Sequence, residues 1–332
     1  MNYSRKVYNK AATVLERRRS NAEHVQLLHR DEAYSKIPEL IEIDREIASA
    51  GAQVIRAIGM GENAQSYIED LSKRNLASQQ RRKDILKENG YPENYLDADY
   101  HCKECRDTGF VGGVMCDCYR ELLRDTAVAE LSEFSISGCP TFESFNINYY
   151  PDAADAQSGV NLRERMSEVL NFCKSYAEDF GTDSPSLLFY GATGLGKTHL
   201  SLAIAAEAVK KGYGVIYGSA QNLMARLEKE HFSNNRTNNE FEGSEQAMLE
   251  CDLLVIDDLG AEFSTQFTVA ELYNIVNTRM MSRLPVIIST NLMPDELEKR
   301  YTQRITSRIV GNYISLYFCG RDIRQLKLME QE

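Results

Sequence analysis

Eight consecutive residues have the types and spacing of a phosphate-binding loop, G-x-x-x-x-G-K-[ST]: Gly191, Ala192, Thr193, Gly194, Leu195, Gly196, Lys197 and Thr198. Glycines let backbone N–H groups surround phosphates, and the N-terminus of a following helix favours their negative charge. In such a loop Lys197 reaches the β- and γ-phosphates and Thr198 ligates Mg²⁺. An apolar strand precedes the loop and an apolar helix follows it, a context that a simple glycine-rich turn does not require. These residues therefore predict a site for ATP and Mg²⁺.

Polar residues also end two later apolar strands of the chain. Asp257 and Asp258 follow the apolar run 253–256, and Asn291 follows an expected strand at 285–290. Because open parallel sheets bind ligands at the carboxyl ends of their strands, these side chains should lie beside the phosphate loop. We expect Asp257 to hold the Mg²⁺ shell and Asp258 to orient and polarise the attacking water. Asn291 could hydrogen-bond both the γ-phosphate and that water.

Four cysteines within 17 residues have a spacing suited to a metal ion: Cys102, Cys105, Cys116 and Cys118. Glycines lie between the two pairs, as a tight knuckle needs. Four thiolates suit tetrahedral Zn²⁺, although the last pair is C-x-C rather than the commoner C-x-x-C, and His101 could replace one cysteine. We predict one closed, structural zinc site. The remaining cysteines are expected to be small buried side chains: Cys139, Cys173, Cys251 and Cys319.

The nucleotide site needs a scaffold, and the residues from about 160 onward alternate between strand and helix patterns. We expect strands at 187–190, 214–218, 252–257, 285–290 and 314–318. We expect helices, with a polar loop after the third of them, at 161–180, 197–211, 220–230, 266–283 and 294–310. Such alternation predicts a parallel sheet covered by helices on both faces.

The chain before that scaffold divides into three expected parts. Residues 1–98 should form a helical, partner-binding region, because glycine is sparse and apolar residues recur at helical spacing. Residues 99–137 should form the zinc knuckle and a helix. Residues 138–160 are rich in turn formers and aromatic residues and should be a linker, which leaves 161–332 for the nucleotide-binding domain.

Composition restricts the remaining classes of function. The 332 residues carry a formal net charge of −11, so any contact with nucleic acid must come from a local patch rather than from the whole surface. No apolar run approaches the roughly 18 residues that span a membrane, and the polar N-terminus lacks the apolar core of a signal peptide. We therefore expect a cytoplasmic protein without membrane contacts and without disulfides.

Together with two C-terminal segments, 304–311 and 320–324, these motifs resemble the AAA+ helicase loaders of the DnaC/DnaI type. The resemblance covers residues 138–328, and the transposition helper ATPase IstB is a close cousin. The segment 141–145 is similar to the entry into the AAA+ core of this family. A helical N-terminal region ending in a cysteine cluster is similar to that of DnaI-like loaders and favours a loader over IstB. The implied fold is an α/β AAA+ P-loop core, preceded by a helical domain with a zinc-binding knuckle.

The resemblance also implies roles for individual residues. Five of those named above fall on the family's Walker A, Walker B and sensor 1 positions: Lys197, Thr198, Asp257, Asp258 and Asn291. Arg308 resembles the arginine finger that completes a neighbour's site, and Arg324 resembles sensor 2. Arg304 and Arg321 are the nearby alternatives, or else surface charges. Many relatives carry glutamate at the position of Asp258, so in this chain the water must lie closer or be reached indirectly.

The function that the resemblance implies is an ATP-hydrolysing helicase loader of DNA replication. Its cofactors would be ATP, Mg²⁺ and Zn²⁺, and its partners a replicative DNA helicase, single-stranded DNA and further copies of the chain in a ring or spiral. An IstB-like ATPase that assists a transposase is the alternative within the same fold. A small-molecule P-loop kinase is disfavoured by the C-terminal arginines and the cysteine cluster. A non-hydrolysing adaptor, which uses ATP only to fix its shape, stays open.

One segment, 227–237, is a candidate contact for single-stranded DNA. DnaC-like loaders and their initiator relatives use this region of the fold for DNA. In this chain it offers Phe232 for stacking on a base, and Lys229 and Arg236 for phosphates. The alternative is a solvated loop after an amphipathic helix, and it is supported by the carboxylates of Glu228, Glu230 and Glu240.

Overall fold

The computed structural model describes residues 3–57, 64–133, 140–154, 159–232 and 243–329 of the chain. The chain forms two compact units: residues 12–119, and residues 1–11 together with 120–332. The cysteine cluster thus falls in the same unit as the N-terminal helices, whereas the sequence-based division grouped it with the helix that follows. Among the described residues, no helix is long and apolar enough to cross a bilayer.

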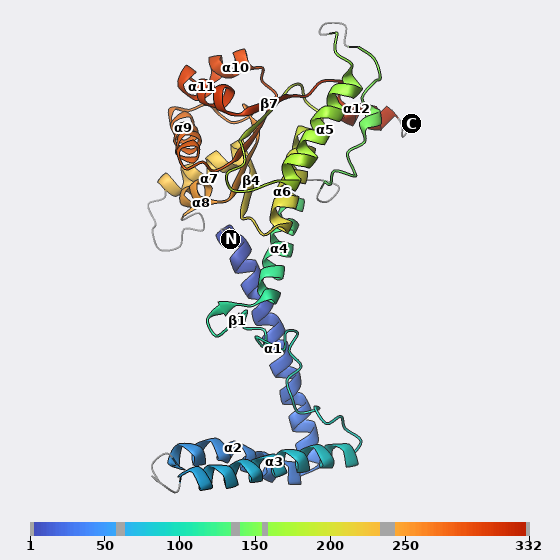
Figure 1. The fold of residues 1–332 in the computed structure, drawn as a ribbon, viewed down its shortest axis with the longest axis vertical. Coiled ribbons are helices and arrows are strands. Elements are labelled where there is room, and N and C mark those ends of the chain that lie inside the picture. The colour runs from blue at the N-terminus through green and yellow to red at the C-terminus, as the bar shows by residue number, and fades with distance from the viewer. Residues whose placement is uncertain (1–2, 58–63, 134–139, 155–158, 233–242, 330–332) are drawn as a thin grey trace. The chain divides into compact units, whose positions relative to one another are not determined.

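The unit of residues 12–119 contains residues 12–98 of the predicted helical region. Its helices are α1 (Arg5–Lys36), which begins in the other unit, α2 (Glu39–Ala57) and α3 (Ala64–Glu88). Helices α2 and α3 lie side by side (Figure 1). Apolar residues of the three helices, with Ile37 between α1 and α2 and Leu96 after α3, form a buried cluster in this unit: Ala33, Ile37, Leu40, Ile43, Ile85, Leu86 and Leu96. A short antiparallel hairpin follows, made of β1 (Phe110–Val111) and β2 (Val114–Met115).

The other unit is built on the predicted parallel sheet. Its five strands are β3 (Leu187–Tyr190), β4 (Val215–Ser219), β5 (Leu253–Leu259), β6 (Val286–Thr290) and β7 (Ile314–Tyr317). They are ordered β4-β5-β6-β3-β7, and every neighbouring pair is parallel. The strand that leads into the phosphate loop, β3, therefore lies next to the strand that leads into Asn291, with the Asp257 strand one place further. This order brings the three predicted strand ends to one edge of the sheet.

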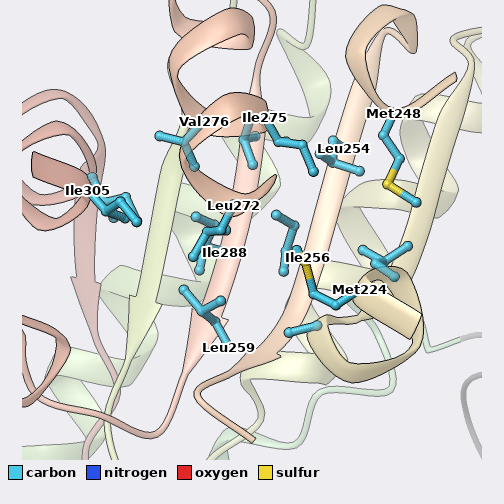
Figure 2. Packing of buried hydrophobic residues seen from close by; sticks show 14 of the residues in the cluster. Met224, Met248, Leu254, Ile256, Leu259, Leu272, Ile275, Val276, Ile288 and Ile305 are labelled. Atoms are coloured by element: carbon cyan, nitrogen blue, oxygen red, sulfur yellow. The ribbon is translucent and has the colours of Figure 1, made fainter. Parts of the chain in front are cut away.

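Helices cover both faces of this sheet, as the alternating pattern predicts. On one face, α6 (Lys197–Lys210) contacts β4, β5 and β6, and α5 (Leu162–Glu178) packs against α6. On the other face a single apolar core joins the sheet to a second group of helices (Figure 2). That group consists of α7 (Ala220–Phe232), α8 (Ser244–Glu250), α9 (Gln266–Met281), α10 (Pro294–Arg300) and α11 (Gln303–Asn312). Outside these layers are α4 (Asp117–Ser132), the 3-10 helix η2 (Ile147–Tyr149) and α12 (Ile323–Met329).

The structure corrects the single helix expected at 294–310, because two helices occupy that segment. Tyr301 leaves the helical conformation, with φ −113° and ψ 117°, and closes α10. Its hydroxyl donates a hydrogen bond to the buried carboxylate of Glu262. This bond keeps the end of α10 in the core. The polar loop expected after residue 230 is corrected in part, because α8 follows residue 243. Helix α12 had no counterpart in the sequence-based expectation.

Candidate nucleotide-binding site and cysteine cluster

The phosphate loop follows β3 and ends in the first turn of α6. At two of its glycines, both the backbone conformation and the closeness of neighbouring atoms exclude a side chain. Gly191 has φ 135°, and a Cβ there would lie 2.2 Å from the carbonyl oxygen of Phe318. Gly194 has φ 73°, and a Cβ there would lie 1.9 Å from a carboxylate oxygen of Asp322. The loop is therefore folded tightly against the segment after β7, and side chains at these two positions would displace it.

Lys197 lies inside this loop and is only 6% exposed. Its Nζ donates to the carbonyl oxygens of Gly191 and Ala192, each at 2.6 Å, and to Oδ1 of Asn291 at 2.8 Å. An ammonium group at this position can exchange carbonyl acceptors for phosphate oxygens without moving far. The structure thus brings the predicted Walker A lysine and the predicted sensor 1 asparagine into direct contact.

The electrostatic surroundings of Lys197 show which charged groups lie near the loop. The pKa of Lys197 is lowered to about 8, chiefly by burial and to a smaller extent by the positive charge of Arg324. The carboxylates of Asp258 and Asp257 act in the opposite direction. Arg324 itself is exposed, and it follows Asp322, whose carboxylate packs at the loop. A bound nucleotide phosphate would favour the charged form of Lys197 by the same Coulomb effect that the aspartates exert.

Asp257, near the carboxyl end of β5, is a buried carboxylate with several donors around it. Thr198 Oγ1 donates to its two oxygens at 2.9 and 3.2 Å, and the hydroxyl of Tyr217 donates at 2.7 Å. The hydroxyl of Ser289 also donates to it. Mg²⁺ prefers hard oxygen ligands and takes one or two from the protein. The Thr198 hydroxyl and the Asp257 carboxylate, which already lie in contact, fit that requirement.

Asp258 adopts a backbone conformation that is uncommon for a residue with a side chain. Its φ is 55°, at an irregular register between β5 and β6, and its N–H donates to Ser289 Oγ at 2.9 Å. Its Oδ1 accepts a hydrogen bond of 2.6 Å from the side-chain amide of Asn291. Asn291, just after β6, in turn accepts from Lys197, the first residue of α6, so three side chains form one continuous chain of hydrogen bonds. Left-handed residues of this kind concentrate at functional sites.

The predicted arginine finger lies apart from this network. Arg308, on α11, donates from Nε to Asn277 at 2.9 Å and has its guanidinium 4.8 Å from the centre of the Tyr273 ring. It also donates to the carbonyl oxygen of Arg304, whose own side chain is exposed. These contacts are all on α9 and α11, and none joins Arg308 to the phosphate loop of its own chain. Its role as a finger therefore stays a prediction.

Several residues that complete the site were missed by sequence reasoning. Tyr217 and Ser289 hold Asp257, and they come from inside β4 and β6, where nothing distinguishes them from ordinary core residues. Buried Glu262 accepts a 2.8 Å hydrogen bond from the N–H of Gly260 and so fixes the turn after Asp258. A pocket of about 310 Å³ lies beside the linker and α12, lined by Asn148, Tyr149, Pro151, Arg321, Leu326 and Met329. Of these residues, sequence reasoning had singled out only Arg321.

The four predicted cysteines lie together in the unit of residues 12–119. The sulfur atoms of Cys102 and Cys116 are 3.7 Å apart, those of Cys105 and Cys118 are 3.4 Å apart, and all four lie within 4.8 Å of one another. Tetrahedral Zn²⁺ with Zn–S bonds of about 2.3 Å separates its sulfurs by roughly 3.8 Å, so the cluster fits one such ion. The pKa of Cys102 is lowered to about 7, chiefly by a hydrogen bond from the backbone N–H of Cys105, whereas burial and the neighbouring cysteines raise the pKa of Cys118.

The backbone around the cluster is fixed by a buried acid. Asp107 is 2% exposed, and its carboxylate accepts 2.9 Å hydrogen bonds from the N–H groups of His101 and Cys102. The residue itself has φ 56°, in the turn between the first cysteine pair and the hairpin. The side chain of His101 is exposed and is not among the four clustered ligands. Outside the cluster, Cys173, Cys251 and Cys319 are buried as predicted, and Cys139 lies outside the described residues.

We expect purified protein to hold close to one equivalent of zinc, and the Cys105→Ser variant to lose it, because metal affinity depends on the full set of thiolates. Elemental analysis of protein prepared without chelator measures this directly. Cys173→Ser is the matched control, because Cys173 is equally buried but lies in the other unit. Metal content near zero in the unaltered protein, or equal content in both variants, would contradict the assignment.

The predicted DNA segment is only partly visible. Phe232 is 68% exposed, and its ring packs against those of His231 and Phe267. Lys229 is also exposed, whereas Arg236 lies outside the described residues. A cavity of about 260 Å³ next to these rings is lined by three carboxylates, those of Glu230, Glu245 and Glu271. The aromatic surface suits a base, but the acidic neighbours do not attract a phosphate backbone.

The parallel sheet and the site at its strand ends define an AAA+ P-loop domain. Residues 171–309 match the family described as IstB-like ATP binding protein. The chain is 29% identical over 160 residues to the replicative helicase loader DnaC of Escherichia coli K12, covering 47% of this chain and 62% of that protein. It is 33% identical over 141 residues to the chromosomal replication initiator DnaA of Aquifex aeolicus, covering 42% and 34%.

Solved structures with related sequences include the same two groups of proteins. The crystal structure of the DnaC helicase loader is matched at 24% identity with a TM-score of 0.42, over 52% of this chain and 99% of that one. AMPPCP-bound DnaA from Aquifex aeolicus is matched at 26% identity with a TM-score of 0.44, over 57% and 55%. The chain spans less than two thirds of the length of the E. coli DnaC that it matches.

Proposed function

We propose that this protein is an ATPase that loads a replicative DNA helicase, acting in the cytoplasm. The observation that carries the enzymatic part is the hydrogen-bonded chain from Lys197 through Asn291 to Asp258. It links a group for the phosphates to a group for the attacking water. The loading function is supported by the resemblance of the ATPase domain to replicative helicase loaders.

Each residue of the site would have its own role in the hydrolysis of ATP to ADP and phosphate. Lys197 would give up the carbonyls of Gly191 and Ala192 and bind phosphate oxygens. Thr198 and Asp257 would hold Mg²⁺, which supplies positive charge against the charge that develops on the phosphates. Asp258 would accept a hydrogen bond from the attacking water and orient it. Asn291, which already contacts both Lys197 and Asp258, would release one of these contacts to bind the γ-phosphate.

The base of the nucleotide has a candidate position as well. The 310 Å³ pocket is flanked by the linker on one side and by Arg321 and α12 on the other. Both flanks also touch the phosphate loop, through Tyr150 and through Ile323. Its lining combines the Tyr149 ring and apolar side chains with the amide of Asn148, a mixture typical of small-molecule sites. Arg324, near Lys197, would face the phosphates as sensor 2.

The partners follow from the same proposal. The helical region of residues 1–98 would bind the helicase, and the cysteine cluster would hold a structural Zn²⁺ that fixes the fold next to it. Gel filtration of the full chain with the replicative helicase of the same cell, with and without ATP, tests this binding. Co-elution supports the proposal, and separate elution under both conditions contradicts it.

An assembly with a shared site predicts that two inactive variants complement each other. Lys197→Ala spoils the site that binds ATP, and Arg308→Ala spoils the finger offered to the next subunit. Because fingers of this kind contribute about 10³–10⁵ in rate in P-loop enzymes, mixing the two variants should raise phosphate release at least about tenfold above either alone. Mixing Lys197→Ala with Arg304→Ala is the control that separates the two candidate fingers. Absence of recovery in confirmed mixed assemblies would leave Arg308 with no role in a neighbour's site.

Binding of single-stranded DNA is expected to depend on Phe232. Base–aromatic stacking is worth about 1–3 kcal/mol, so Phe232→Ala should weaken binding roughly fivefold or more, with ATP present. Met281→Ala is the control, because Met281 is also highly exposed but lies at the end of α9. Fluorescence anisotropy with a labelled oligonucleotide, repeated at several salt concentrations, gives both affinity and salt dependence. Equal affinity of the two variants would move DNA recognition away from Phe232.

A transposase-assisting ATPase is the second candidate. The description of the matching family as IstB-like is the observation in its favour. The helical region with its cysteine cluster favours the loader. Affinity capture from the native cell would separate the two, because the loader should retain a helicase and the alternative a transposase.

A further inference from the structure

Two consecutive carbonyl groups of the phosphate loop are held from outside the loop. The carbonyl oxygen of Leu195 accepts a 2.8 Å hydrogen bond from the hydroxyl of Tyr150, which belongs to the linker. The carbonyl oxygen of Gly194 accepts a 3.0 Å hydrogen bond from the N–H of Ile323, at the start of α12. The loop is thus fixed by two segments that lie about 45 residues before it and about 130 residues after it.

These contacts determine where the loop's own donors point. A trans peptide unit is planar, with its C=O and N–H directed oppositely. The C=O of Leu195 points outward to Tyr150. The N–H of Gly196 belongs to the same peptide unit and therefore points toward the inside of the loop. The bond from Ile323 to Gly194 does the same for the N–H of Leu195. Inward N–H groups are what a phosphate loop needs, because they donate to the phosphate oxygens.

Tyr150 is itself firmly held. It is fully buried, and its carbonyl oxygen accepts a 2.9 Å hydrogen bond from Nε of Arg163 on α5. Its ring stacks on Phe145, with centroids 5.8 Å apart, and lies against Gly320, where a Cβ would approach it to 3.0 Å. The Tyr150 hydroxyl is protonated at neutral pH, and burial raises its pKa further. Because the ring is held on several sides, its hydroxyl keeps one position relative to the phosphate loop.

The linker meets the nucleotide site at a second point. His199, in the first turn of α6, has its Nε2 2.8 Å from the carbonyl oxygen of Thr141 and 3.2 Å from Ser144 Oγ. Its ring is edge-on to Phe145, with centroids 5.4 Å apart. Residues 141–150 are therefore attached both to the loop and to the helix that follows it.

We infer that Tyr150 is a positioning residue of the phosphate loop, and that nucleotide binding in turn stabilises the linker segment 140–151. The inference rests on the proposed ATP site and deepens it. The second half follows from linkage: a contact that favours the binding-competent loop must itself be favoured when nucleotide binds. Tyr150 touches the loop backbone and not the reacting atoms, so it acts through the geometry of the N–H groups.

Tyr150→Phe removes the hydroxyl and keeps the ring. The affinity for MgATP and MgADP should fall about tenfold, since a lost hydrogen bond and an unsatisfied carbonyl together weaken the prepared loop. Tyr176→Phe is the matched control: Tyr176 is also buried and also donates a 2.8 Å hydrogen bond to a backbone carbonyl, that of Pro185, before β3. Calorimetric titration gives the affinities, and thermal unfolding gives the stability of each variant. A merely structural role would lower the stability of both variants and leave both affinities unchanged.

Hydrogen exchange of segment 140–151 is the second measurement. In the unaltered protein, MgADP should slow exchange in this segment, and in Tyr150→Phe the slowing at saturating MgADP should be lost or strongly reduced. Equal affinity of Tyr150→Phe and the unaltered protein, or exchange in 140–151 that MgADP does not change, overturns the inference while leaving the ATP site intact. If Tyr150→Phe does not fold, the exchange of the unaltered protein decides alone. Failure of the unaltered protein to bind either nucleotide would instead overturn the proposed function.

Discussion

Lys197→Ala is expected to weaken ATP binding by about two to four orders of magnitude. Hydrogen bonds to charged groups contribute about 1.5–3 kcal/mol each, and the ammonium can make two of them to the phosphates. Lys197 is positioned for this because its Nζ already lies among carbonyl acceptors inside the loop. Equilibrium titration with a fluorescent ATP analogue measures the loss. Lys210→Ala, at the exposed end of the same helix, is the control and should bind normally.

The unfolding temperature of Lys197→Ala has to be measured beside its affinity, because the substitution also leaves two loop carbonyls without their donor. A folded variant that binds ATP within a few-fold of the unaltered protein would remove Lys197 from the phosphate site. The hydrogen bond from Lys197 to Asn291 would then only stabilise the fold.

Asp258→Asn is expected to keep ATP binding and to lose hydrolysis by about 10²–10⁴-fold, the usual contribution of a positioned acid–base group. Asparagine matches the size of aspartate and tolerates the left-handed backbone, φ 55°, that this position requires. Its side-chain oxygen can still accept from Asn291, so the change removes mainly the charge that polarises water. Phosphate release under single-turnover conditions, with nucleotide binding measured in parallel, separates the two effects.

Asp252→Asn is the matched control for that experiment. Asp252 lies just before the other end of β5, where it accepts a 2.7 Å hydrogen bond from the N–H of Gly214. Its variant should hydrolyse ATP at the normal rate. Normal hydrolysis by Asp258→Asn would assign the water to another group, and lost binding in that variant would mean that the charge serves the nucleotide rather than the water.

The features that could be predicted from sequence depend on short-range patterns. The phosphate loop has a fixed spacing, and the strand before it and the helix after it were predicted correctly. Asp257, Asp258 and Asn291 could be grouped because parallel strands end at one edge, and the hydrogen bonds now join Asp258 and Asn291 directly. The four cysteines gather as predicted because a knuckle closes within 17 residues. In each case the information lies within a few residues or follows from a rule about sheets.

The features that could not be predicted depend on contacts between distant segments. Arg279 occurs in a helix pattern that suggests an exposed charge, yet it is fully buried and donates to the carbonyls of Met248, Cys251 and Pro285. The break at Tyr301 depends on the distant carboxylate of Glu262. Tyr150 looks like any aromatic residue of a linker until the phosphate loop is placed beside it. No local periodicity encodes partners that are about 30 to 45 positions apart.

The most direct test of the central claim is a helicase-loading assay. The replicative helicase of the same cell is incubated with circular single-stranded DNA that carries an annealed labelled strand, under conditions in which the helicase alone does not load. Strand displacement is then measured with the unaltered protein, with Lys197→Ala and without either, all in the presence of ATP. We expect displacement to require the unaltered protein and to be absent with Lys197→Ala. Displacement that is equal in all three reactions, or that never exceeds the reaction without the protein, would contradict a loader that works through this nucleotide site.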